Sequence, residues 1–89
     1  MSGVRLSSEL IRAARALLRW DQRRLADISS VSLPTVKRLE AKPGMLVAHG
    51  STVAALRRAF EDAGIEFTNG EQPGGRLRKI LRNLEWKQD

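Results

Sequence analysis

A length of 89 residues fits one compact domain, since typical domains have about 100–200 residues. Sixteen Lys and Arg against ten Asp and Glu give a net charge of +6, which makes polyanions such as nucleic acids the leading class of partner. The chain has no cysteine, which excludes disulfides, thiolate chemistry and cysteine-based zinc sites. With 42% hydrophobic and 29% charged residues, the composition is that of a globular protein.

Two further absences bear on location and chemistry. No apolar run approaches the roughly 20 residues of a membrane span, and the first residues lead into no apolar signal core. We therefore expect a cytoplasmic protein with no membrane partner. The single histidine, His49, has no cysteine or second histidine beside it, so we expect it to be structural or solvated and predict no metal site and no cofactor.

The first apolar stripe predicts a helix over residues 8–19. Its apolar positions recur at the spacing of one buried helical face: Leu10, Ile11, Ala14, Leu17 and Leu18. Ser7 or Ser8 is suited to cap the start of this helix, and Glu9 lies favourably in its first turn.

Two short helices are predicted next, separated by a polar turn. Asp21 caps a helix that runs through Gln22, Leu25, Ala26 and Ile28 and stops at Ser29-Ser30. Ser32 caps a third helix that ends before Pro43-Gly44, with Pro34 in the first turn, where a missing N–H costs nothing. We expect the apolar positions of this region to form core: Leu25, Ala26, Val31, Val36 and Leu39.

A fourth helix and a less regular segment follow. Ser51 or Thr52 is expected to open the helix, and Gly64 to end it in the left-handed conformation. Its apolar side carries Val53, Leu56, Ala59 and Phe60.

Beyond Gly64, residues 65–68 alternate apolar and polar like a strand, and turn signals follow at Asn69-Gly70 and Pro73–Gly75. Residues 76–78 could pair back as a second strand, whereas Leu77, Ile80, Leu81 and Leu84 fall on one helical face. We expect a short hairpin that leads into a helix.

The second and third predicted helices form the arrangement of a helix-turn-helix. The third helix carries the exposed cations Lys37 and Arg38, and such a helix can enter the major groove with its N-terminal side chains near base edges. Residues 22–40 resemble the Cro and phage-repressor-like (XRE) helix-turn-helix family. The resemblance rests on Gln22 at the helix start, Leu25-Ala26, Val31-Ser32 at the turn, and the ending Val36-x-x-Leu39-Glu40.

This resemblance covers about residues 10–64, and the segments 63–67 and 73–78 also look like a bacterial branch of the family. It implies a mainly α fold. We expect a compact four-helix lambda-repressor-like helix-turn-helix domain over residues 1–64 and a C-terminal extension over residues 65–89. The extension would form a short hairpin and/or helix used for dimerisation.

The resemblance also implies roles for single residues. Gln22 matches a residue that contacts a phosphate, and Leu33, Pro34 and Arg38 match positions that face bases, flanked by Ser32, Thr35 and Lys37. The planar fork of Arg38 suits guanine O6 and N7, whereas Leu33 and Pro34 could contact a thymine methyl group. Arg15 and Glu40 match a structural ion pair. Ser30 stands where the family usually has glycine, at a cost of about 1 kcal/mol in the left-handed region.

Charge and position add two more candidates. We expect Arg23 to contact DNA and Lys42, just beyond the third helix, to reach a phosphate, whereas Arg57 and Arg58 more resemble solvated faces. Trp20 and Phe60 are expected to be core residues rather than stacking platforms for bases.

The leading functional hypothesis is a sequence-specific DNA-binding transcriptional regulator. It would act as a homodimer on an inverted repeat of double-stranded DNA, close to the bacterial nucleoid, and repress by occluding a promoter, since no effector domain fits in the remaining residues. The dimer surface is expected after Gly64, from these apolar residues: Ile65, Phe67, Leu77, Ile80, Leu81 and Leu84.

The alternative is an antitoxin-type module whose C-terminal segment binds a protein partner while the helix-turn-helix regulates its own operon. RNA binding is less favoured, because neither an aromatic stacking sheet nor a glycine-rich clamp is present. An enzyme is the least favoured class, and we predict no catalytic residues. The carboxylates Asp21, Asp27 and Glu40 have structural explanations as cap, exposed face and ion pair.

Overall fold

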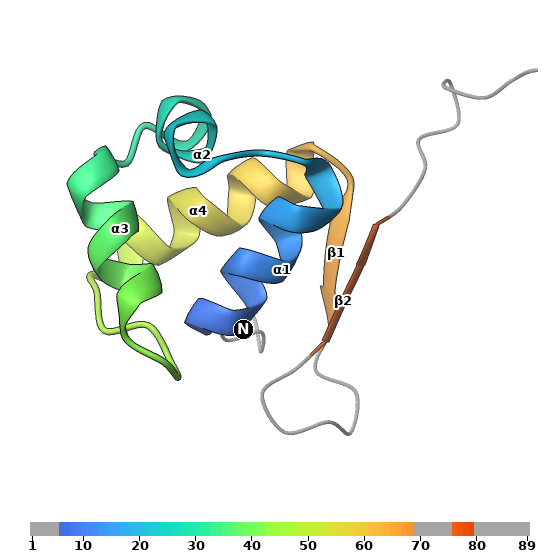
Figure 1. Ribbon diagram of the computed structural model, residues 1–89. Coiled ribbons are helices and arrows are strands. Elements are labelled where there is room, and N and C mark those ends of the chain that lie inside the picture. Colours follow the sequence, from blue (N-terminus) through green and yellow to red (C-terminus); the bar gives the residue numbers. More distant parts are fainter. Residues whose placement is uncertain (1–5, 69–75, 80–89) are drawn as a thin grey trace, which may run out of the picture.

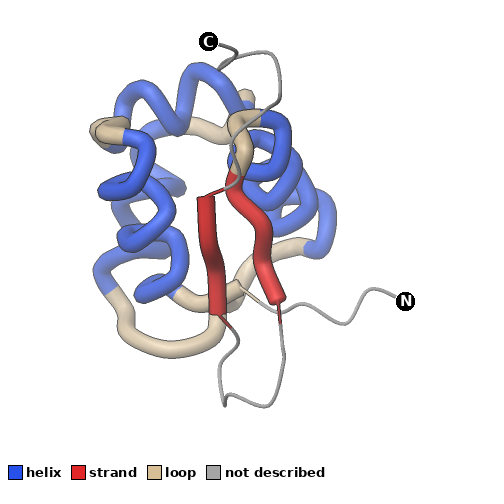
Figure 2. The backbone as a smooth tube through the Cα atoms, turned by 90° about the vertical axis from the view of Figure 1, so that its right-hand side faces the viewer, coloured by secondary structure: helices blue, strands red, loops and turns tan. Residues whose placement is uncertain are grey.

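Four helices and a two-stranded hairpin make up residues 6–68 and 76–79, the part of the chain described by the computed structural model. The helices are α1 (Ser8–Leu18), α2 (Gln22–Ser29), α3 (Leu33–Ala41) and α4 (Gly50–Asp62). Strands β1 (Ile65–Thr68) and β2 (Arg76–Lys79) pair antiparallel, with Phe67 opposite Leu77. α3 and the hairpin lie on opposite sides of the molecule (Figure 1), and Figure 2 shows both strands in front of the helices. The expectation of a mainly helical, compact fold is confirmed.

One apolar core joins all four helices and β1. Its largest fully buried side chains are Phe60, Ile11, Leu25, Leu56, Ile65 and Val36. Phe60 stacks on Trp20 with ring centroids 5.8 Å apart and meets the edge of Phe67 at 6.0 Å, so both residues expected to be core residues contribute to it. The Phe60 ring is fully buried and so packs α4 against Trp20 and β1.

β1 completes this core, which corrects one prediction. Ile65 and Phe67 were expected on a dimer surface, but both are buried against the helices of their own chain. Because strand side chains alternate between two faces, the apolar face of β1 is used within the chain and is not available to a second copy. The predicted helix through Ile80, Leu81 and Leu84 lies outside the described residues.

Side-chain caps begin three of the helices at or near the predicted positions. The Ser7 hydroxyl accepts the Leu10 N–H at 3.1 Å, the Asp21 carboxylate accepts the Arg24 N–H at 2.8 Å, and the Ser32 hydroxyl accepts the Thr35 N–H at 3.3 Å. Each bond satisfies an N–H group that has no partner within its helix. After the C-terminal end of α4, Gly64 has φ +103°, which agrees with the predicted positive φ at this glycine.

The start of α4 and the end of α1 differ from prediction. α4 begins at Gly50, after His49, whose side chain makes no capping hydrogen bond. The His49 carbonyl accepts the N–H groups of Thr52 and Val53 at 3.0 and 3.1 Å, so Ser51 and Thr52 lie inside the first turn and do not cap it. α1 ends at Leu18, and Arg19 follows it in the left-handed region with φ 58°.

One apolar residue predicted to face the core is exposed instead, and a second apolar side chain is exposed on the following helix. Leu17 on α1 is 42% exposed and Ile28 on α2 is 44% exposed. Leu17 lies about 120° around its helix from the buried Ile11, and Ile28 lies at the margin of the face that buries Leu25. The prediction for Leu17 was wrong because an apolar stripe read from spacing alone is wider than the face that the neighbouring helices cover.

The loop after α3 is tied to the start of α1. The Ser8 N–H donates to the Gly44 carbonyl at 2.9 Å, and the Leu46 N–H donates to the Leu6 carbonyl at 3.1 Å. The Gly44 N–H donates to the Glu9 carboxylate at 3.2 Å. Gly44 has φ +98°, a region that side chains disfavour, so a glycine here allows the loop to close against α1.

The Glu9 contact predicts a pH effect on this loop. Hydrogen bonds from the backbone N–H groups of Glu9 and Gly44 hold the pKa of the Glu9 carboxyl below its ordinary value of 4.5. A lowered pKa means that the ionised form is favoured in the folded state. The contact therefore contributes to stability above pH 4.5 and is lost as the pH falls through the folded-state pKa. We expect the NMR shift of the Gly44 amide to titrate with an apparent pKa below 4.5; a midpoint at or above 4.5 would contradict the contact.

Two negative findings apply to residues 6–68 and 76–79. No helix there is long and apolar enough to cross a membrane. Within the same ranges, no group of three or more His, Cys, Asp or Glu residues is placed to hold a metal ion.

Candidate nucleic-acid interface

The outward face of α3 carries exposed cations. Val36, Leu39 and Glu40 are buried against the rest of the fold, because they recur at the spacing of one helical face. Lys37 and Arg38 are left on the solvent side, and Lys42 is exposed directly after the helix. Burial of one side of this helix thus fixes which side chains an external ligand can reach.

The connection between α2 and α3 is short and held by serine side chains. Ser30 ends α2 with φ 64° and ψ 22°, which is the left-handed conformation expected at the position where the family usually has glycine. The buried Ser29 hydroxyl accepts the Val31 N–H at 3.2 Å. At the start of α3, the Ser32 hydroxyl also donates to the Thr35 hydroxyl at 2.9 Å. These bonds satisfy polar groups of the turn and of the first turn of α3.

A buried carboxylate joins the first three helices. Glu40, on α3, accepts hydrogen bonds from Arg15 Nε at 2.8 Å and Arg15 Nη2 at 2.7 Å. The Glu40 side chain is 4% exposed and the Arg15 side chain is 19% exposed. The Gln22 amide, on α2, donates to the same carboxylate at 3.1 Å. Arg15 Nη1 also donates to the Trp20 carbonyl at 3.0 Å.

This network has the ion pair that the family resemblance implied. Hydrogen bonding to Glu40 raises the pKa of the Arg15 guanidinium, so Arg15 stays charged. The Arg12 guanidinium donates to the Glu40 backbone carbonyl at 3.0 Å, which adds a second link from α1 to the end of α3. The position of α3 relative to α1 and α2 therefore depends on Glu40.

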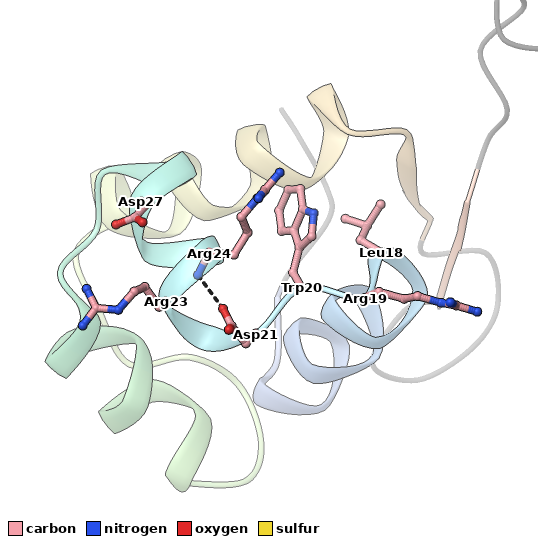
Figure 3. A pocket seen from close by; sticks show the side chains of 7 residues that line it. All are labelled: Leu18, Arg19, Trp20, Asp21, Arg23, Arg24 and Asp27. Carbon is pink, nitrogen blue, oxygen red and sulfur yellow. Dashed lines mark hydrogen bonds between the residues drawn. The ribbon is translucent and has the colours of Figure 1, made fainter.

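The N-terminus of α2 opens beside a shallow basic hollow. Figure 3 shows Leu18, Trp20 and Arg24 gathered on one side of this hollow, with Arg23 and Asp27 on the other. The Asp21 carboxylate lies at the helix start, where it accepts the Arg24 N–H. A helix N-terminus and nearby arginines favour anions, whereas Asp21 opposes them.

The predicted contact residues divide into three groups by environment. The exposed group is Arg23, Ser32, Pro34, Lys37, Arg38 and Lys42. Gln22 and Thr35 are half-buried. The Gln22 side chain is hydrogen-bonded to Glu40, and the Thr35 side chain to Ser32. Leu33 is also half-buried but packs against the apolar core, so only part of its side chain remains for a base contact.

The exposed cations among these residues have no competing partners. Within the part of the chain that the structure describes, Arg23, Lys37, Arg38 and Lys42 form no ion pair and no side-chain hydrogen bond. Arg38 and Lys42 line one hollow beside the end of α3, whereas Arg23 lines the separate hollow at the start of α2. Their charge is therefore available to a polyanion that spans both helices.

Sequence reasoning missed two features near this interface. Arg19 and Arg24 line the hollow at the start of α2, and their closeness in sequence to Arg23 was the signal that could have included them. It also did not identify the bond from Gln22 to Glu40, because the partners lie 18 residues apart and no local spacing reports the contact.

Comparison with known proteins leaves the family open. No protein-family model matches the chain, and no curated protein matches it.

Proposed function

We propose that this chain is a sequence-specific DNA-binding transcriptional regulator that inserts α3 into the major groove. In this proposal α2, the turn over residues 30–32 and α3 act as a helix-turn-helix of the Cro and phage-repressor-like type. The observation that carries the proposal is that Lys37 and Arg38 are exposed on a short helix whose opposite face is buried, and that neither is paired with another described residue. A major groove about 12 Å wide accepts a helix presented in this way.

The side chains on α3 divide between base and backbone contacts. Arg38 has the bidentate fork that matches guanine, and Pro34 offers an apolar surface for a thymine methyl group. Lys37 and Lys42 supply charge for phosphates, which contributes affinity without sequence information. Because Leu33 is partly used in the core, we expect DNA shape to add to the direct contacts.

The size of this helix supports a proposed dimer. α3 has nine residues and is about 13 Å long, so one copy can contact only a few base pairs. A two-fold dimer would read two half-sites about 10 base pairs apart on an inverted repeat. We propose that such a complex represses transcription by covering promoter DNA, and that the dimer contact lies outside the buried face of β1.

The Gln22→Ala variant tests the proposed phosphate contact. One N–H of the Gln22 amide is directed to Glu40, which leaves the second for a phosphate oxygen. We expect the variant to bind an operator and unrelated DNA about 5- to 20-fold more weakly, a loss of about 1–2 kcal/mol, without changing the salt dependence. Fluorescence anisotropy at several salt concentrations measures both quantities. A loss confined to the operator would argue against phosphate contact.

The Asp21→Asn variant tests whether the start of α2 faces the DNA backbone. Asparagine caps a helix about as well as aspartate, so the fold should be retained while one negative charge is removed. We expect DNA affinity to rise about two- to fivefold, from roughly 0.3–1 kcal/mol of electrostatic relief at a helix terminus. Asp62→Asn, at the end of α4, is the matched control for charge. Equal gains in both variants would show that only net charge matters.

Chemical-shift mapping tests the proposed face as a whole. Titration of the ¹⁵N-labelled chain with a short DNA duplex should shift the amides of α3 and of the first turn of α2. The β1 amides, on the opposite side of the molecule, should stay unchanged. Shifts centred on β1, or no shifts at low salt, would overturn the proposal.

A further inference from the structure

The loop between α3 and α4 forms an exposed apolar ridge over residues 45–47. Val47 is 77% exposed and Met45 is 42% exposed, while the intervening Leu46 packs partly against the core. Single exposed apolar residues are common, but two that flank Leu46 on one fixed loop form a surface that a partner can cover.

The ridge separates two hollows. One, of about 700 Å³, lies between the ridge and the end of α3, and the other, of about 410 Å³, lies between the ridge and the start of α4. Met45 and Leu46 line both. Each volume is within the range of about 300–1,000 Å³ that is typical of ligand pockets, so each can take apolar side chains from a partner.

The backbone under the ridge is held in place. Hydrogen bonds join Gly44 to Ser8 and Glu9, and Leu46 to Leu6, as described above. A partner therefore meets a preformed surface and does not have to order this loop, which reduces the entropic cost of binding.

The charged side chains that line the two hollows have one sign. Arg38 and Lys42 line the larger hollow, and Arg57 lines the smaller one. Among the described residues, no Asp or Glu lines either hollow. A ligand that fits this surface combines apolar side chains with negative charge.

We propose that the ridge docks a short acidic segment of a partner protein, with two or three apolar side chains seated in the hollows. DNA fits less well, because its phosphate backbone offers little apolar surface to Met45 and Val47. A second copy also fits less well, because a two-fold contact places the same patch on both sides and would bring Arg38 and Lys42 of both copies together. Among the alternatives that the sequence left open, this proposal favours a protein partner.

Docking at the ridge would also affect DNA binding. This consequence rests on the proposed DNA-binding function, whereas the docking itself does not. Arg38 and Lys42 are proposed DNA contacts, and both line the larger hollow. A bound acidic segment covers them, so the partner and DNA exclude each other. The partner would then release the regulator from its operator.

The test uses synthetic peptides of about four helical turns as probes. The first peptide has Leu at positions i, i+3, i+4 and i+7 and Glu at the others; a second has Lys in place of Glu, and a third has Ser in place of Leu. Each is titrated into the ¹⁵N-labelled full chain without DNA. We expect only the acidic apolar peptide to shift the amides of residues 42–47, with at least tenfold tighter binding than the other two.

Variants locate the site. Val47→Ser changes a mostly exposed side chain and should weaken peptide binding about five- to tenfold. Leu17→Ser, which changes an exposed apolar residue outside both hollows, should have no effect. Equal binding of the Lys peptide, or amide shifts centred outside the ridge, would overturn the proposal. It would also be overturned if the ridge amides shifted with DNA or with rising protein concentration but not with the acidic peptide.

A competition experiment separates this proposal from the proposed function. The acidic apolar peptide should displace a bound duplex from the wild-type chain, and Val47→Ser should still bind the duplex but resist displacement. Peptide binding at the ridge in a chain that fails to bind any duplex would leave docking intact and overturn only the DNA function. Simultaneous binding of peptide and duplex would overturn the exclusion.

Discussion

Replacing Glu40 with alanine is expected to lower the free energy of unfolding by about 3–5 kcal/mol. The substitution leaves the Arg15 guanidinium without its carboxylate in a largely buried position, and the Gln22 amide also loses its acceptor. Domains of this size are stable by about 5–15 kcal/mol, so the loss removes a large part of the total. Urea unfolding followed by circular dichroism measures it.

Two companion variants make this result specific. Asp27→Ala changes an exposed carboxylate on α2 and should alter stability by less than about 0.5 kcal/mol. Arg15→Leu combined with Glu40→Leu removes both charges and should recover much of the loss, because no unpaired charge is left between the helices. A Glu40→Ala variant that loses less than 1 kcal/mol would show that the network does not hold the three helices together.

Replacing Arg38 with alanine is expected to cost about 1–3 kcal/mol of operator affinity and to relax the preference at one base pair in each half-site. The guanidinium is exposed on α3 and has no protein partner among the described residues, so its removal should leave the fold intact. Footprinting and binding to operators mutated one position at a time measure the change.

The matched control is Arg58→Ala on α4, whose guanidinium is exposed and lines a hollow away from α3. This variant loses the same charge, so it corrects for the general electrostatic contribution. We expect its sequence preference to stay as in the wild-type chain. Equal losses in both variants on every DNA would contradict base reading by Arg38.

Local sequence signals predicted most of the helical framework because their physical causes are local. Ser7, Asp21 and Ser32 bond to N–H groups three residues ahead, so a short window of sequence contains both partners. Periodicity likewise located the buried Val36 and Leu39. The outward position of Lys37 and Arg38 followed from the same spacing.

Features that depend on distant partners were harder to predict. The bond between Gln22 and Glu40 and the exposure of Leu17 are set by how α1, α2 and α3 pack, which no single helix encodes. The apolar ridge at Met45 and Val47 lies in a loop without periodicity. Its outward placement depends on hydrogen bonds to Leu6, Ser8 and Glu9, far away in the sequence.

Selection of genomic fragments by the purified full chain, followed by footprinting, tests the central claim most directly. A regulator that reads DNA through α3 should enrich one inverted repeat and protect two half-sites about 10 base pairs apart, or a multiple of that distance. Its affinity should fall with salt in proportion to the number of phosphates contacted. Enrichment of no common sequence, with equal affinity for all fragments, would contradict sequence-specific recognition by this protein.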